Sequence, residues 1–206
     1  MPGTVKSCGI SFPDGWIWWP IHRGPVKVDE LVEEAADGPD AQAVVRRALD
    51  VLDALCRDDG FFYCAALWVP DRTTGDVVAT ARVSLATGPL ERDASRDELL
   101  EIARGVRSQR GVKLFDRAVV SLEMPAGPAY GCVTVLAETS RGVFGIGRRP
   151  SPVQTRAEIT VVPPGSSDVL CLSLLTFDSN LIDALGVQAG LIAESIVVGI
   201  GPAEDA

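Results

Sequence analysis

Apolar residues recur at helical spacing in several stretches of the chain. The clearest case follows Asp40, whose side chain can accept hydrogen bonds from the free amides of a first helical turn. Ser95 and Glu98 form a capping-box pair, and Asp178 or Ser179 can cap the last helix. The predicted helices span residues 28–36, 40–56, 96–109 and 179–198.

Other apolar stretches have the length and alternation of strands. They span residues 9–21, 61–70, 76–86, 114–124, 130–138, 155–163 and 168–177. The short connection at 71–75 predicts a hairpin, and the connections after residue 114 are too short for the crossover that parallel strands require. The nearly continuous apolar runs 61–70 and 168–177 need cover on both faces.

These patterns together predict an α+β fold. The sheet is expected to be mostly antiparallel, with six to seven strands flanked by helices in an α/β/α sandwich. At 206 residues the chain is long enough for one domain, which we predict over 9–199, with flexible ends at 1–8 and 200–206.

Composition narrows the function classes. The formal net charge of −9 makes nucleic acid an unfavourable partner, since affinity for phosphate backbones comes largely from Lys and Arg. The first residues lack the apolar core of a secretory signal, and no stretch reaches the roughly 18 apolar residues of a spanning helix. We therefore expect a cytoplasmic protein without a membrane partner.

No constellation of residues predicts catalysis, so we expect no enzyme, no cofactor and no metal. His22 is the single histidine, and its neighbours predict a solvated loop; Cys8 is the nearest nucleophile in sequence. The five cysteines are widely spaced, without a CxxC pair, which indicates buried free thiols and not a disulfide frame or zinc site. The acidic residues between Glu30 and Asp37 indicate a solvated helix face.

A run of tryptophans is the first candidate for binding a partner. Strand alternation sends Trp16 and Trp18 to one face and Ile17 and Trp19 to the other. One face is expected to enter the core, while the other is either covered by a helix or exposed to a partner. Exposed tryptophan is enriched at interface hot spots.

The second candidate is a basic segment in an acidic protein. Gly142, Gly145 and Gly147 separate Arg141 from Arg148 and Arg149, but Pro150 excludes the helix that a phosphate cradle requires. A β-hairpin or mobile loop is predicted, with the three arginines as a docking contact for an acidic partner.

The order of elements, together with three segments, resembles the PsbP-like (MOG/PsbP-type) superfamily. The segments are FPDGW near the start, EMPAGPAYG in mid-chain and VLCLSLLTFDSNLIDALGVQAGLIAESIVV at the end. The resemblance implies an α/β/α sandwich of the kind found in uncharacterised actinobacterial members, and a binding scaffold in place of an enzyme. No family residue is carried over.

The sequence therefore favours a non-enzymatic, protein-binding adaptor or chaperone-like scaffold, whose partner is another protein. A homodimer is compatible with the same features. Two alternatives stay open: a module that binds an apolar small molecule between sheet and helix, and a cysteine-dependent enzyme using Cys8 with His22.

Overall fold

The computed structural model describes residues 3–21, 27–59, 62–87, 112–141 and 148–202. The strands are β1 (Thr4–Gly9), β2 (Trp16–Pro20), β3 (Phe62–Trp68), β4 (Ala79–Thr87), β5 (Val112–Met124), β6 (Gly127–Arg141), β7 (Arg148–Val161), β8 (Asp168–Thr176) and β9 (Val197–Gly201). The helices are α1 (Val28–Ala35), α2 (Pro39–Asp59) and α4 (Ile182–Glu194), with a short 3₁₀ turn, η2 (Ser179–Leu181). The predicted helix at 96–109 lies outside the described residues.

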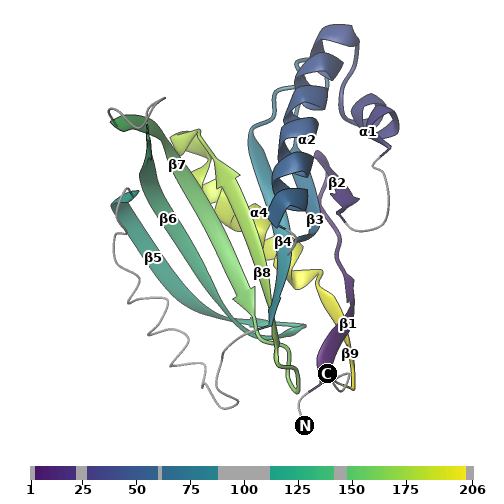
Figure 1. Ribbon diagram of the computed structural model, residues 1–206, viewed down its shortest axis with the longest axis vertical. Helices are drawn as coiled ribbons and strands as arrows, with labels where there is room; N and C mark the ends of the chain where they lie inside the picture. Colours follow the sequence, from purple (N-terminus) through teal and green to yellow (C-terminus); the bar gives the residue numbers. More distant parts are fainter. Residues whose placement is uncertain (1–2, 22–26, 60–61, 88–111, 142–147, 203–206) are drawn as a thin grey trace.

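Seven strands form the main sheet, in the order β2-β3-β4-β8-β7-β6-β5. Every pairing between these neighbours is antiparallel. Figure 1 shows α1 and α2 on one side of the sheet and α4 on the other. The predicted fold class, an antiparallel sheet in an α/β/α sandwich, is thus confirmed, as is the hairpin that joins β3 to β4.

Strand β3 shows why a continuous apolar run was needed. Cys64 and Ala66 join the core cluster that contains the buried face of α4. Ala65 and Leu67, on the opposite face, join the cluster that contains α1 and α2. Because successive side chains alternate between the two layers, neither face of this strand tolerates a polar residue.

The ends of the chain form a second, smaller sheet. Residues 1–8 and 200–206 were assigned to flexible ends, yet β1 pairs with β9 in an antiparallel ribbon that includes Thr4↔Gly201 and Gly9↔Val197. The closing helix was expected to reach Val198 but ends at Glu194, a correction to the sequence prediction. The predicted cap, Asp178, caps the 3₁₀ turn η2 and not α4: its side chain accepts from the Asn180 amide at 2.9 Å, whereas α4 follows Leu181 without a side-chain cap.

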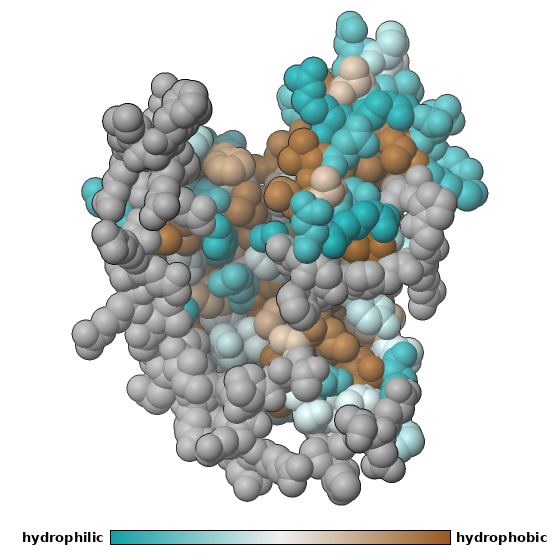
Figure 2. Space-filling model, in the orientation of Figure 1, coloured by the Kyte–Doolittle hydropathy of each residue, from teal (hydrophilic) through white to brown (hydrophobic). Residues whose placement is uncertain are grey.

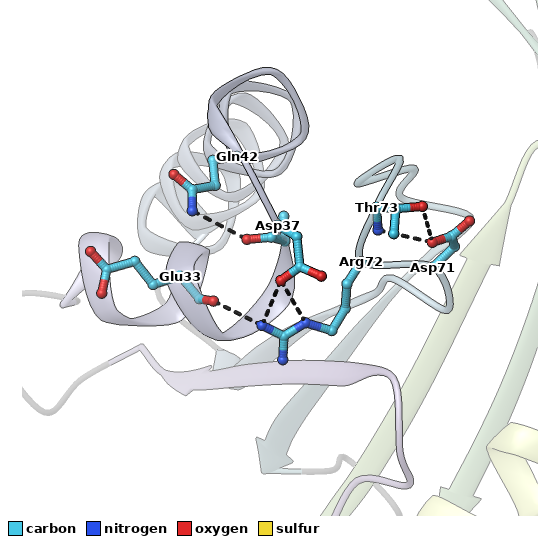
Figure 3. A network of polar contacts seen from close by, with 7 residues as sticks. Glu33, Asp37, Gln42, Asp71, Arg72 and Thr73 are labelled. Carbon is cyan, nitrogen blue, oxygen red and sulfur yellow. Dashed lines mark hydrogen bonds and ion pairs between the residues drawn. The ribbon is translucent and has the colours of Figure 1, made fainter.

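A polar corner fastens α1 and α2 to the sheet (Figure 3). The Arg72 guanidinium, in the loop after β3, donates to the Asp37 carboxylate at 3.1 Å and to the Glu33 carbonyl at 3.2 Å. The Asp37 amide donates to the Arg72 carbonyl at 2.8 Å, so backbone and side chain lock together. Gly75 completes the corner, because its backbone approaches Ala41 at the start of α2.

Helix α2 begins one residue earlier than predicted. Pro39 takes the first helical position, where its missing N–H costs nothing, and Asp40 lies inside the first turn, where it favours the helix dipole. Among the described helices, none combines the length and apolarity needed to cross a membrane.

Gly75 provides a test of the corner. Its φ is +68°, and an added Cβ would lie 2.5 Å from the Ala41 carbonyl oxygen. We expect Gly75→Ala to lower the free energy of unfolding by more than about 2 kcal/mol, since roughly 1–2 kcal/mol of backbone strain is joined by a backbone clash. The measurement is urea denaturation.

Gly38→Ala is the matched control. Gly38 has a φ of +81°, but a Cβ there meets nothing within 4 Å. Gly38→Ala should lower the free energy of unfolding by about 1–2 kcal/mol, from backbone strain alone. Equal losses in the two variants would show that the approach to Ala41 is unimportant.

Cys64 predicts how stability depends on alkaline pH. Burial raises the pKa of its thiol from an ordinary 9.0 to about 12. Between these values the unfolded chain loses the thiol proton while the folded chain keeps it, so the free energy of unfolding falls as pH rises. Denaturation of Cys64→Ala from pH 8 to 11 should give a shallower decline than the wild type, whereas parallel curves would contradict the raised pKa.

Candidate functional site

Strand β2 begins at a tight turn that the sequence marks clearly. The Trp16 amide donates to the Pro13 carbonyl at 3.2 Å, and Gly15 takes a φ of +83°. The Gly15 carbonyl then accepts from the Val69 amide at 2.7 Å, which starts the pairing with β3. The predicted Pro-Asp-Gly turn is confirmed, and it sets the register of the tryptophans that follow.

The three neighbouring tryptophans have different environments. Trp19 is 2% exposed and packs between β3 and the two N-terminal helices, whereas Trp16 is 7% exposed and faces α4. Trp18 is 44% exposed. Of the tryptophans proposed to contact a partner, the structure therefore leaves only Trp18 open, while Trp16 and Trp19 lie in the core.

Both buried indoles satisfy their N–H groups. The Trp16 Nε1 donates to the Gln188 amide oxygen of α4 at 2.9 Å, and the Trp19 Nε1 donates to the Asp53 carboxylate of α2 at 3.0 Å. Asp53 also accepts from the Arg57 Nε at 2.7 Å, which balances its charge. Helices from both layers thus hold β2 in place through specific polar contacts.

Aromatic stacking continues to the surface. The Trp16 and Trp68 rings stack with centroids 5.7 Å apart, and Phe12 lies 5.8 Å from Trp16 and 6.1 Å from Trp18. Phe12 therefore links the buried rings to the exposed one. The Trp18 indole packs on one side against Phe12. Because this contact already restricts the side chain, binding a partner costs it less conformational entropy.

A cavity of about 330 Å³ lies at this edge of the sheet. Its walls come from the turn before β2, from β2 itself and from helix α1. We call it the β2-edge pocket; it is lined by Phe12, Pro13, Asp14, Gly15, Trp16, Ile17, Trp18, Leu31 and Glu34. Since it includes residues from both faces of β2, it lies along the strand's open side.

The charged side chains of the β2-edge pocket are acidic. Asp14 and Glu34 are both exposed, and none of the nine described lining residues is a cation. Figure 1 shows α1 beside β2 at the margin of the sheet, with β5 at the opposite margin. The pocket therefore combines an exposed indole, aliphatic Leu31 and two carboxylates.

The basic segment lies elsewhere. Arg141 ends β6 and pairs with Arg148 at the start of β7, with Ser140 opposite Arg149, so the strands meet as a hairpin would. Residues 142–147 lie outside the description, and a docking role of these arginines stays a prediction. Three strands separate β7 from β2 in the sheet, so the structure does not bring the arginines and tryptophans together.

A polar surface on the sheet was missed by sequence reasoning. On the face away from α4, the Thr160 hydroxyl lies 3.8 Å from the Cys171 sulfur and hydrogen-bonds to Tyr130. Burial raises the pKa of both the Tyr130 hydroxyl and the Cys171 thiol, with a smaller contribution from Glu158 nearby. Period-two alternation indicates such a face only once the pairing of β6, β7 and β8 is known.

The thiol of Cys8, the candidate nucleophile, is half-buried. All five cysteines are free, and burial raises the pKa of Cys8, so the thiolate is disfavoured near neutral pH. His22 lies outside the described residues. In the part of the chain that the structure describes, no group of three or more His, Cys, Asp or Glu residues is arranged to hold a metal ion. The acidic run from Glu30 to Asp37 lies on the exposed side of α1 and at the polar corner.

No protein-family model matches the sequence, and no curated protein matches it significantly. Among solved structures it is similar to LpqN of Mycobacterium tuberculosis, described as involved in cell envelope biogenesis, with 14% identity and a TM-score of 0.46 over 96% of this chain and 86% of that one. It is also similar to the cyanobacterial PsbP (CyanoP) of Synechocystis sp. PCC 6803, with 10% identity and a TM-score of 0.40 over 95% and 94%.

These likenesses concern the fold alone. The actinobacterial origin stays a prediction.

The different environments of Trp18 and Trp19 predict different costs of truncation. Trp19→Ala removes a fully packed ring and one of the two donors to the Asp53 carboxylate, so it should cost about 3–5 kcal/mol of folding free energy. Trp18→Ala removes an exposed ring and should cost less than about 1 kcal/mol. Chemical denaturation of the two variants measures both values, and similar losses would contradict the assigned faces.

Proposed function

We propose that this chain is a non-enzymatic protein-binding scaffold and that the β2-edge pocket, with Trp18, is its binding surface. The observation that carries the proposal is the 44% exposed Trp18 indole on an edge strand, stacked on Phe12 beside a cavity of about 330 Å³. An exposed aromatic ring beside a pocket is typical of interface hot spots.

The rigid support beneath Trp18 favours the same interpretation. Trp16 and Trp19 fix the strand on either side through hydrogen bonds to Gln188 and Asp53. A partner therefore meets a preformed surface, and most of the apolar contact area contributes to affinity without an ordering cost. Trp and Tyr anchors of this kind typically contribute 2 kcal/mol or more to binding.

The raised pKa of Cys8 weighs against the cysteine-dependent alternative. Nucleophilic cysteines have lowered pKa values, because the thiolate is the reactive form. Burial moves the pKa of Cys8 in the opposite direction. We therefore assign it a packing role on β1, against the core cluster that contains α4.

The volume of the β2-edge pocket is also compatible with the alternative of a small-molecule ligand. Its volume of about 330 Å³ lies at the lower end of the range for ligand sites, roughly 300–1,000 Å³. The open sides and two carboxylates fit a polypeptide better than an apolar molecule. A thermal-shift screen that finds a small molecule with Trp18-dependent stabilisation would replace the protein-binding proposal.

The test of the proposed function is quantitative capture from the native host. Tagged wild-type protein and Trp18→Ala should be compared for one recurrent partner, followed by titration calorimetry with that purified partner. We expect Trp18→Ala to weaken binding at least about tenfold, equivalent to about 1.4 kcal/mol.

Phe115→Ala is the matched control. Phe115 is a 50% exposed aromatic residue on β5, the opposite edge of the same sheet. The Phe115→Ala variant should bind the partner with the affinity of the wild type. A partner that is lost equally from both variants, or from neither, would exclude the β2 edge as the binding surface.

A further inference from the structure

The outer side of β2 presents a defined set of backbone groups. The Val69 amide donates to Gly15 and the Ile21 amide donates to Tyr63, in the register Trp16↔Trp68. Hydrogen bonds in an antiparallel pair occur at every second residue, so Ile17 and Trp19 bond to β3. The backbone groups of Trp16, Trp18 and Pro20 therefore point away from the sheet.

Along the outer side of β2, hydrogen-bond acceptors outnumber donors. The carbonyls of Trp16, Trp18 and Pro20 are three acceptors, but Pro20 has no N–H and the Trp16 amide already donates to Pro13. The Trp18 N–H is the one outward donor left along this strand. None of the described strands pairs with β2 on this side, since β2 is the terminal strand of the seven.

We propose that the partner binds as an added antiparallel strand along β2, and that the added segment is extended and basic. This inference rests on the proposed function and specifies how the same site recognises its partner. Unpaired edges are templates for strand addition, in which the backbone supplies affinity and alternate side chains supply specificity. The partner residue opposite Trp18 exchanges two hydrogen bonds with it, and the residues two positions away donate to Trp16 and Pro20.

The side chains around β2 determine which types of side chain should alternate along the added strand. The partner residue opposite Trp18 points to the same face as the indole and Phe12, which favours an aliphatic side chain. The residues on either side of it point to the face of Ile17, toward Leu31 and Glu34. With Asp14 and Glu34 as the charged groups lining the pocket, Lys or Arg is favoured at those positions.

A second copy of this chain fits the edge poorly. In a symmetric pair centred on Trp18, the carbonyl of Trp16 would face Pro20 of the other copy, which has no N–H to donate. The pair would keep only the two bonds between the Trp18 residues. It would also bring together Asp14 and Glu34 from two chains that each carry a net charge of −9. A basic strand avoids both problems.

The test uses a synthetic peptide as the probe, acetyl-TVKVRVT-amide, whose central Val is designed to lie opposite Trp18. Binding is measured by titration calorimetry with the full chain, and hydrogen exchange of the Trp18 amide is followed by NMR. We expect saturable binding, and Trp18 exchange slowed at least about tenfold at saturation, because its outward N–H gains a carbonyl partner.

Two methylated peptides separate backbone pairing from side-chain adhesion. N-methylation of the central and following Val removes donors that face β2 and should weaken binding at least about tenfold. The same two methyl groups on Lys and Arg lie on the outer side of the added strand and should change affinity less than about threefold. Equal effects of the two peptides overturn strand addition.

The charge component has its own variants. Glu34→Gln and Asp14→Asn each should weaken the peptide about two- to fivefold at low salt, with a smaller effect at high salt, and acetyl-TVEVEVT-amide should not bind. Undiminished binding of the acidic peptide overturns the basic partner. Self-association that Trp18→Ala abolishes, without peptide binding, overturns it in favour of a second copy.

These outcomes are distinct from failure of the proposed function. If capture of a partner depends on Trp18 but the peptide leaves the Trp18 amide unprotected, strand addition is wrong and the binding surface stands. If capture is independent of Trp18, the proposed function fails, whatever the peptide does.

Discussion

The pairing of β2 with β3 is the constraint on which the site depends. In the register Trp16↔Trp68, Trp19 is directed toward α2 and Trp18 toward the surface. A shift by one residue would bury Trp18 and expose Trp19, because strand side chains alternate with period two. The Trp19–Asp53 hydrogen bond opposes that shift, since the half-buried Asp53 carboxylate would lose one of its two donors. The packing of Trp19 in the core thereby determines that Trp18 is exposed at the surface.

The second requirement is the position of α1. Leu31 and Glu34 complete the β2-edge pocket, and α1 is too short to be stable by itself. The Arg72 contacts with Glu33 and Asp37 hold its C-terminal end, as Figure 3 shows. In the space-filling view of Figure 2, apolar residues emerge between the polar surface of α2 and the sheet. The N-terminal helices thus cover β2 on one face while leaving its edge open.

The sequence predicted most elements because their signals are local. Antiparallel pairing followed from short connections, and the hairpin between β3 and β4 followed from the connection predicted at 71–75, although residues 69–78 join the two strands. Prolines hid the start of β7, where Pro150 pairs with β6 alone, since β8 meets β7 only from Thr155 onward. A strand tolerates proline where one side is unpaired. The β1–β9 ribbon was missed because its partners lie at opposite ends of the chain.

The sequence alone determined that neighbouring tryptophans face opposite ways, because backbone geometry sets that alternation in any strand. It also determined the turn that starts β2 and the proline that removes a donor near its end. Only the tertiary structure decided that β2 is an edge strand, that α4 reaches Trp16 but leaves Trp18 exposed, and that Glu34 lies beside it. Exposure depends on which distant segments cover a residue, and that is a property of the packed chain, not of any local pattern.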